Sequence, residues 1–255
     1  MATGAHEAGG MVAPAWRSRF RPSFHFWLVL AMCFFVFAGF GLHSALPALQ
    51  GRFPPAPPVV HLHGLVFVGW MLLLLAQTSL VCAGNVKLHR SLGMWGIAHA
   101  TAVLLIGLLI QLVASRAGMD AGRDPGTDGL YLGVLAVIAF GVLFTAAIRN
   151  RQRPMVHRQA ICFAMLPVLP PGVNRFWFNV LALDDPIPTF WLYLTLWTMA
   201  GALLVYEWRS SGRINGWSLF GAGWIFAQGM VHEAVVGTAW FSEFSRALLE
   251  MSRYR

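Results

Sequence analysis

Residues 59–83 read VVHLHGLVFVGWMLLLLAQTSLVCA, an apolar stretch in which no side chain carries a permanent charge. A helix of about 20 such residues crosses the roughly 30 Å hydrocarbon core of a bilayer. Further apolar runs lie on either side of this one, at 26–42, 92–114, 130–148, 157–183, 188–206 and 217–231. The pattern predicts an all-α membrane protein, a bundle of about seven transmembrane helices, or six if the last run is re-entrant.

The composition agrees with a membrane protein and disfavours several other classes. The chain is 57% hydrophobic and 11% charged, whereas soluble domains average roughly 45–50% and about 25%. Its net charge of +8 comes from basic residues in short clusters between the apolar runs, and this placement is typical of topology signals rather than of a nucleic-acid-binding face. The sequence contains no nucleotide-binding loop, nucleophile–base motif or HExxH. The expected partner is therefore the lipid bilayer, with no nucleic acid.

The charges also predict the domain organisation and the orientation. We expect a flexible basic N-terminus at 1–22, a single helical-bundle domain at 23–236 and an interfacial C-terminal segment at 237–255. Positively charged loops stay on the cytoplasmic side of a membrane. The loops after the second, fourth and sixth runs carry Lys87, Arg90, Arg149, Arg151, Arg153, Arg158, Arg209 and Arg213. The prediction is a multi-pass protein of the bacterial inner membrane with its N-terminus in the cytoplasm.

The fifth run contains Pro167, Pro170 and Pro171, each of which removes a backbone hydrogen-bond donor. We expect a kinked or locally unwound helix, which a membrane tolerates only against protein or a water-lined cavity. Arg175 follows near the outer end, where an unpaired charge in an apolar run is unfavourable. Two interpretations stay open: Arg175 pairs with the aspartates at 184–185, or it binds an anionic lipid, a haem propionate or a substrate carboxylate.

His63, Trp70 and Gln77 recur every seven residues in the second run, so they share one face of a helix. Lipid offers polar groups no partner, so this face should point into the bundle. His63 and Gln77 then serve either as hydrogen-bond partners between helices or in a ligand or cofactor site. A metal site near the outer face is a further hypothesis, because imidazole and carboxylate suit zinc, copper or iron. Its spacing matches no known metal motif, and its members would be His43, His61, His63 and His232, with Glu233 and the aspartates at 184–185.

His89 and His157 each open a predicted span at the same face, and each is followed by an arginine. Two histidines at matching depth on different helices can ligate a b-type haem through neutral imidazole nitrogens. Arg90 and Arg158 would then pair with the haem propionates, since a guanidinium fork suits a carboxylate. The alternative is that both His-Arg pairs anchor helix starts in the headgroup layer. His25 precedes the first run and indicates no role.

Three of these stretches resemble a family of bacterial inner-membrane proteins of six or seven helices: LHGLVFVGWMLLLLAQTSLV (62–81), KLHRSLG (87–93) and VHRQ (156–159), followed by Arg175. The closing WSLFGAGWIFAQGMVHEAVVGTAWFSEF resembles the end of that family as well. The family is of the domain-of-unknown-function type, so the resemblance implies a fold and no reaction. The positions it carries over are His63, His89, Arg90, His157, Arg158 and Arg175.

A more distant similarity to cytochrome b561-type bundles implies a haem held between histidines on neighbouring helices. That pattern has paired histidines at both membrane faces, whereas here the outer partner of His63 is ambiguous.

Three classes of function follow. The first is b-type haem-based electron transfer at His89 and His157, with a quinol as electron donor. The second is a transporter or carrier of a small molecule or metal, which would use the broken fifth helix and Arg175. The third is a non-catalytic subunit or assembly factor of a larger membrane complex.

Overall fold

The computed structural model describes residues 20–52, 55–127, 129–183 and 189–251, and within these ranges the chain forms helices and no strand. This confirms the predicted all-α class. The α-helices are α1 (Phe24–Phe40), α2 (Leu46–Leu49), α3 (Pro58–Cys82), α4 (Val86–Asp120), α5 (Leu130–Arg149), α6 (Pro154–Met165), α7 (Pro170–Asn174), α8 (Phe190–Ser211), α9 (Gly216–Val235) and α10 (Ala239–Met251). Two π-helical segments, η1 (Gly41–Ala45) and η3 (Arg175–Val180), and one 3-10 turn, η2 (Leu166–Val168), complete them.

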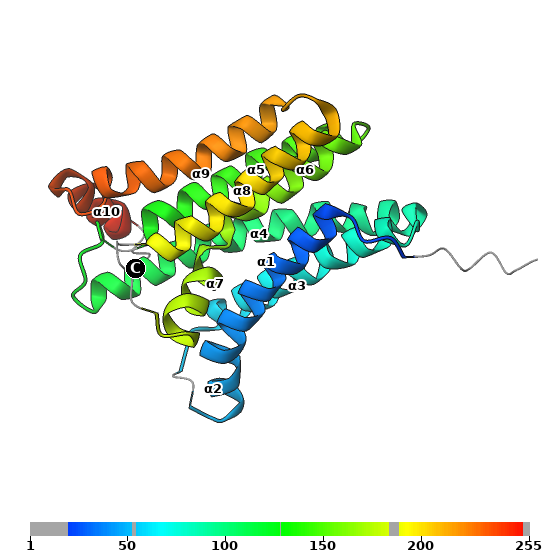
Figure 1. Ribbon diagram of the computed structural model, residues 1–255. Helices are drawn as coiled ribbons and strands as arrows, with labels where there is room; N and C mark the ends of the chain where they lie inside the picture. The colour runs from blue at the N-terminus through cyan, green and yellow to red at the C-terminus, as the bar shows by residue number, and fades with distance from the viewer. Residues whose placement is uncertain (1–19, 53–54, 128, 184–188, 252–255) are drawn as a thin grey trace, which may run out of the picture.

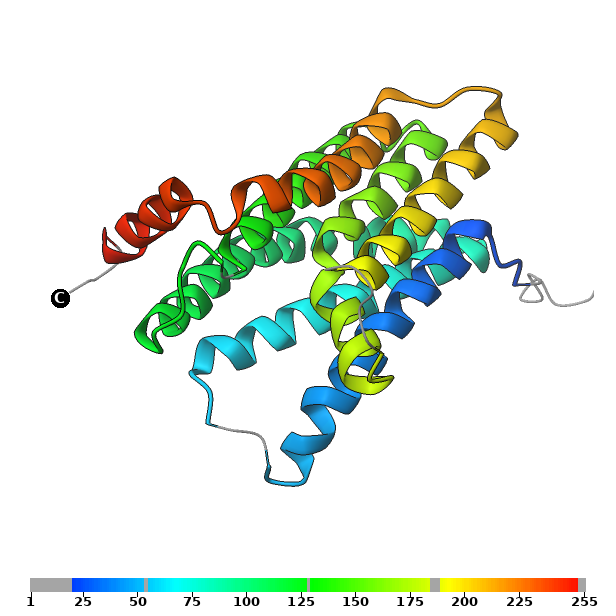
Figure 2. The ribbon, with the colours of Figure 1, turned by 60° about the vertical axis from the view of Figure 1, so that its left-hand side comes forward.

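The long helices pack in two sets, which Figures 1 and 2 show from two sides. In the first set α3 packs against α4 and α1; in the second, α5 packs against α6, and α9 packs against α5, α6 and α8. Contacts of α4 with α5, and of α1 with α7 and η3, join the two sets. The buried core between them includes Trp70, whose indole N–H lies 2.9 Å from the sulfur of Met165.

Five helical stretches of the described chain are long and apolar enough to cross a membrane: 24–49, 58–82, 86–120, 130–149 and 190–211. The chain is therefore suited to several membrane passes, as predicted. The third stretch is longer than the expected 92–114, because helix α4 begins at the N-cap Asn85, whose side chain accepts a hydrogen bond from Leu88 N–H at 3.1 Å. The seventh predicted run forms α9, which is not among the five.

The fifth predicted run is broken, as its prolines indicate. Helix α6 ends at Met165, and η2, α7 and η3 continue the chain with changed helical hydrogen bonding. The break packs closely against α1, because Gly39 and Gly172 lie where the two helices meet. A β-carbon on Gly172 would lie 2.9 Å from the Cα of Val36, so the contact requires a residue without a side chain.

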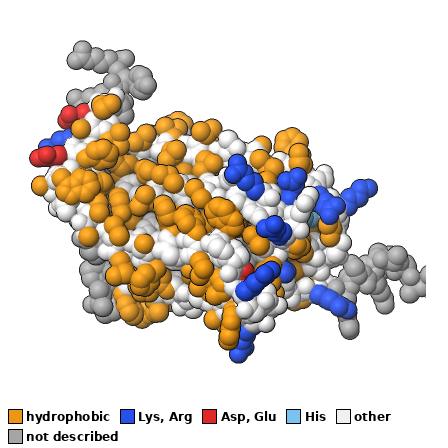
Figure 3. Space-filling model, turned by 90° about the horizontal axis from the view of Figure 1, so that it is seen from above, with side chains coloured by type: hydrophobic (Ala, Val, Ile, Leu, Met, Phe, Trp, Pro, Cys, Tyr) orange, Lys and Arg blue, Asp and Glu red, His pale blue; other side chains and the backbone are white. Residues whose placement is uncertain are grey.

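The two ends of the bundle differ in charge. Lys and Arg side chains gather toward one end of the face in Figure 3, and apolar side chains cover its middle. We call this end the basic end; it holds the ends of α3, α5 and α8 and the starts of α4, α6 and α9. Helix α1 also begins there, since Arg21 N–H donates to the Cys82 carbonyl at 3.1 Å.

Helix α10 lies at the opposite end, in line with an interfacial C-terminal segment. Gly237 N–H donates to the Gly126 carbonyl at 3.2 Å, and the Ser242 hydroxyl donates to Asp124 at 2.8 Å. Its apolar side buries Phe241 and Leu249. Most of the basic N-terminus and the last arginines of the tail lie outside the described residues.

Candidate functional site

The structure brings His89 and His157 together at the basic end. Their ring centroids are 6.5 Å apart, and the ring planes are nearly perpendicular, at 84°. Each histidine lies in the first turn of its helix, α4 or α6, and the second of these helices begins with Pro154 at its first position. Proline suits that position because the missing N–H would have no intrahelical partner.

Main-chain groups lie close to both rings. Nδ1 of His157 donates to the carbonyl of Ala147 at 2.9 Å, which leaves its other nitrogen as an acceptor in the neutral ring. The ring of His89 lies close to the main chain of Gln77. Nδ1 of His89 is buried and has no hydrogen-bond partner among the described residues. A ring held at one nitrogen with the other nitrogen free is the usual arrangement of a metal-ligating histidine.

The two arginines that follow these histidines differ in exposure. Arg90 is exposed, whereas Arg158 is half-buried. Nε of Arg158 is buried without a partner among the described residues, and its charge acts on His25 and on Cys162. Of the two expected propionate partners, only Arg158 therefore reaches into the bundle.

A third histidine, to which the sequence assigned no role, is buried near Arg158. His25 is only 3% exposed, and its ring contacts that of Tyr206 from α8 with centroids 5.0 Å apart. Both of its nitrogens are buried without a partner in the described chain. Helix α1 begins two residues earlier than the apolar run indicates, because the Ser23 hydroxyl accepts a hydrogen bond from Phe26 N–H. That N-cap was the signal that would have placed His25 inside the bundle.

Two further polar side chains at the basic end are buried and were also missed. Gln159 is fully buried and donates to the Leu203 carbonyl at 3.0 Å. Glu207, 2% exposed, accepts hydrogen bonds from the main chain and the side chain of Asn215. The signal for Glu207 was a lone carboxylate directly after an apolar run, next to the turn into α9.

A second polar cluster lies at the opposite end, where α7 passes into η3. Arg175 donates to the Pro171 carbonyl at 2.9 Å, and its guanidinium lies 4.5 Å from the centre of the Phe40 ring. The charge of Arg175 also acts on His63, whose ring packs against Phe67 at 4.2 Å. Arg175 Nε and His63 Nδ1 are buried without partners in the described chain. The expected pairing with the aspartates at 184–185 lies outside the described residues.

Of the proposed outer metal set, the structure describes the four histidines, while the Glu233 side chain and the aspartates at 184–185 lie outside its description. His43 and His61 are exposed, while His63 and His232 are half-buried. Among the residues that the structure describes, no three His, Cys, Asp or Glu side chains gather in a metal-binding group. On the heptad face of α3, Trp70 is buried and the carbonyl oxygen of the Gln77 side chain is buried without a partner within the described ranges.

The apolar helices and the polar clusters buried between them define a multi-pass helical membrane protein. No protein-family model, curated protein or solved structure matches the chain.

Proposed function

We propose that the chain is a bacterial inner-membrane protein that binds a b-type haem between His89 and His157 and takes part in electron transfer, with a quinol as donor. In this proposal it crosses the membrane seven times, with its N-terminus in the cytoplasm. The observation that carries the haem is the 6.5 Å separation of the two ring centroids.

This separation agrees with the geometry of a bis-histidine iron site. With bonds of about 2 Å from the iron, two axial nitrogens lie about 4 Å apart and their ring centres, each about 1 Å further back, about 6 Å apart. The two rings come from helices of different sets, since α4 packs on α3 and α5 while α6 packs on α5 and α9. The histidines therefore face each other across the boundary between the sets.

The surrounding side chains suit such a group. The Ala147 carbonyl holds the His157 ring in orientation, and the main chain of Gln77 lies close to the His89 ring. Arg158, with its unpartnered Nε, supplies a cation for a propionate at the membrane surface. A bound haem would supply one-electron chemistry, while the protein would contribute ligation, orientation and burial.

A second candidate is a carrier for a small anion or a quinol headgroup at the opposite end. The broken helix α6–α7 ends at Arg175, beside His63, and both keep a buried nitrogen without a partner in the described chain. Broken helices in transporters place such groups at the substrate. No contact among the described residues specifically supports the third class, a subunit of a larger complex.

The decisive experiment is an absorption spectrum of protein purified from haem-replete cells. We expect a Soret band that shifts on reduction by dithionite and is lost in His89→Ala and in His157→Ala. His61→Ala, at an exposed histidine, is the matched control and should keep the band. His157→Met should retain haem with a changed spectrum, because thioether replaces imidazole as the axial ligand. A colourless wild-type protein, or a band that survives both alanine variants, would leave the carrier as the leading candidate.

A further inference from the structure

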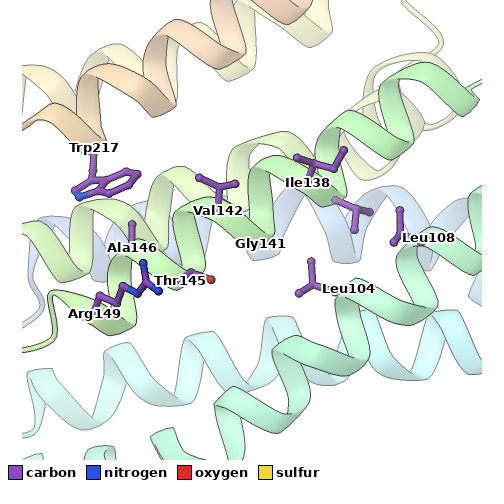
Figure 4. Close-up of a pocket in the computed structure, with 10 residues that line it drawn as sticks. Leu104, Leu108, Ile138, Gly141, Val142, Thr145, Ala146, Arg149 and Trp217 are labelled. Carbon is purple, nitrogen blue, oxygen red and sulfur yellow. The ribbon is translucent and has the colours of Figure 1, made fainter.

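An elongated hollow of about 530 Å³ lies over α5, between α4 and α9 (Figure 4). Its walls are almost wholly apolar: Leu104 and Leu108 come from α4, and Ile138 and Val142 from α5. Arg149 and Trp217 line the hollow at the basic end of the bundle. One end of the hollow is thus cationic and aromatic, and the rest is aliphatic.

A second hollow of about 420 Å³ adjoins the first, because Trp217 lines both. Its lining is mixed: it holds the polar side chains of Asn150, Arg153 and Asn215 beside the apolar side chains of Val156, Trp217 and Phe220. Neither Arg149 nor Arg153 forms an ion pair with any residue of the described chain. Two guanidinium groups without an ion pair in the described chain therefore line the joined hollows, beside the apolar groove over α5.

The length of the groove and the charge at its basic end indicate which kind of molecule it binds. From Ile138 to Arg149 the groove follows α5 for about 16 Å at ~1.5 Å per residue, and one leaflet of the hydrocarbon core is about 15 Å deep. Guanidinium groups bind phosphate well, because their donors match its oxygens. Tryptophan prefers the membrane interface, where Trp217 would mark the boundary between headgroup and chain.

We propose that these joined hollows bind one anionic glycerophospholipid of the leaflet at the basic end. Arg149 and Arg153 hold its phosphate, and an acyl chain lies on α5 between Leu104 and Val142. This site is separate from the histidine pair, so it does not depend on the haem proposal.

The test measures lipid binding to the full-length protein, delipidated in neutral detergent, by native mass spectrometry. The probes are phosphatidylglycerol and phosphatidylcholine with the same acyl chains. In the double variant Arg149→Gln/Arg153→Gln we expect phosphatidylglycerol to bind about thirtyfold more weakly, since each arginine near an anionic lipid contributes roughly a fivefold effect. Phosphatidylcholine carries the same phosphate, but its choline cation offsets the negative charge, so its binding should weaken much less than that of phosphatidylglycerol. The control Arg209→Gln/Arg213→Gln removes two other arginines of the same end and should bind both lipids like the wild type.

A third variant tests the chain-binding part independently. Thr145 is exposed in the groove. The indole ring in Thr145→Trp should therefore fill the groove and weaken the binding of both lipids without disturbing the core. The proposal is overturned if phosphatidylglycerol binds the first double variant as tightly as the wild type, or if the control loses as much. It is equally overturned if Thr145→Trp leaves both affinities unchanged, or if inorganic phosphate displaces the lipid, because the site would then recognise a free anion.

Discussion

Several polar side chains at the basic end are buried, and they differ in whether their polar atoms have hydrogen-bond partners. The nitrogens of His25 and Nδ1 of His89 are buried without partners in the described chain, whereas Glu207 accepts hydrogen bonds at Oε1 and has only Oε2 buried without a partner there. A buried polar group left unpaired costs about 1–3 kcal/mol. An unpaired group of this kind indicates a missing partner, and a paired one indicates a structural role.

Glu207 is the clearest structural case. Glu207→Ala should lower the free energy of unfolding by about 1–3 kcal/mol, because the main-chain N–H of Asn215 loses its acceptor at the turn into α9. Glu207→Gln keeps an acceptor oxygen and should cost less. Thermal unfolding of the purified protein in detergent measures both, with Glu243→Ala on α10 as the control. Equal stability of the alanine variant and the wild type would contradict this role.

At the scale of the elements, the proline-broken run is the part that the sequence describes best. Each proline of the fifth run interrupts helical hydrogen bonding whatever its surroundings, so the break could be predicted from local chemistry. The length of α4 and the early start of α1 were missed, because both depend on N-cap bonds made by polar residues outside the apolar runs. A hydropathy pattern alone does not reveal these N-cap hydrogen bonds.

The contact of α1 with the broken helix depends on small residues. Gly39→Leu should destabilise the fold by about 1–3 kcal/mol through overpacking, since its side chain would meet the main chain of α7. Gly41→Leu is the matched control two residues further along, where nothing lies within 4 Å of a β-carbon. The difference in melting temperature between the two variants is the measurement. If both variants melt at the wild-type temperature, this close contact does not support the fold.

The attachment of α10 should depend on pH through Asp124. Hydrogen bonds from Gly126 N–H and the Ser242 hydroxyl hold the pKa of this carboxyl below its usual 3.8. A lowered pKa in the folded state means that the stabilisation is full above pH 3.8 and is lost as the pH falls through the lowered value. The hydrogen-exchange protection of α10, relative to the intrinsic exchange rate at each pH, should therefore fall on acidification below pH 3.8. In Ser242→Ala the exchange should already be faster at neutral pH, and an unchanged rate in that variant would argue against the anchor.

For the whole molecule, the separation of charges is the basis of the proposed orientation. The basic end collects the loops that follow α3, α5 and α8, and the arginine in α10 lies near Asp124 at the opposite end. Positive loops remain in the cytoplasm, so the proposed orientation places the basic end inside.

Alkaline phosphatase fusions test this orientation. Fusions within 84–90, 149–157 and 209–215 should be inactive, because the enzyme acquires its disulfides only outside the cytoplasm. Fusions after residues 53 and 122 should be active. Activity after residue 151 would reverse the model, and activity on both sides of α9 would show that this helix does not cross the membrane.

The sequence by itself determined the helical membrane class, the main helices and the break in the fifth run, because hydropathy and missing backbone donors act locally. It also singled out His89 and His157. Only the tertiary structure decided that the centroids of their rings lie 6.5 Å apart and that His25 is buried near Arg158. Such proximities depend on how α1, α4 and α6 pack against their neighbours. In an apolar bundle, side-chain shape and close contacts such as Gly39–Gly172 set that packing. The hydrophobic periodicity of a single helix does not contain this information.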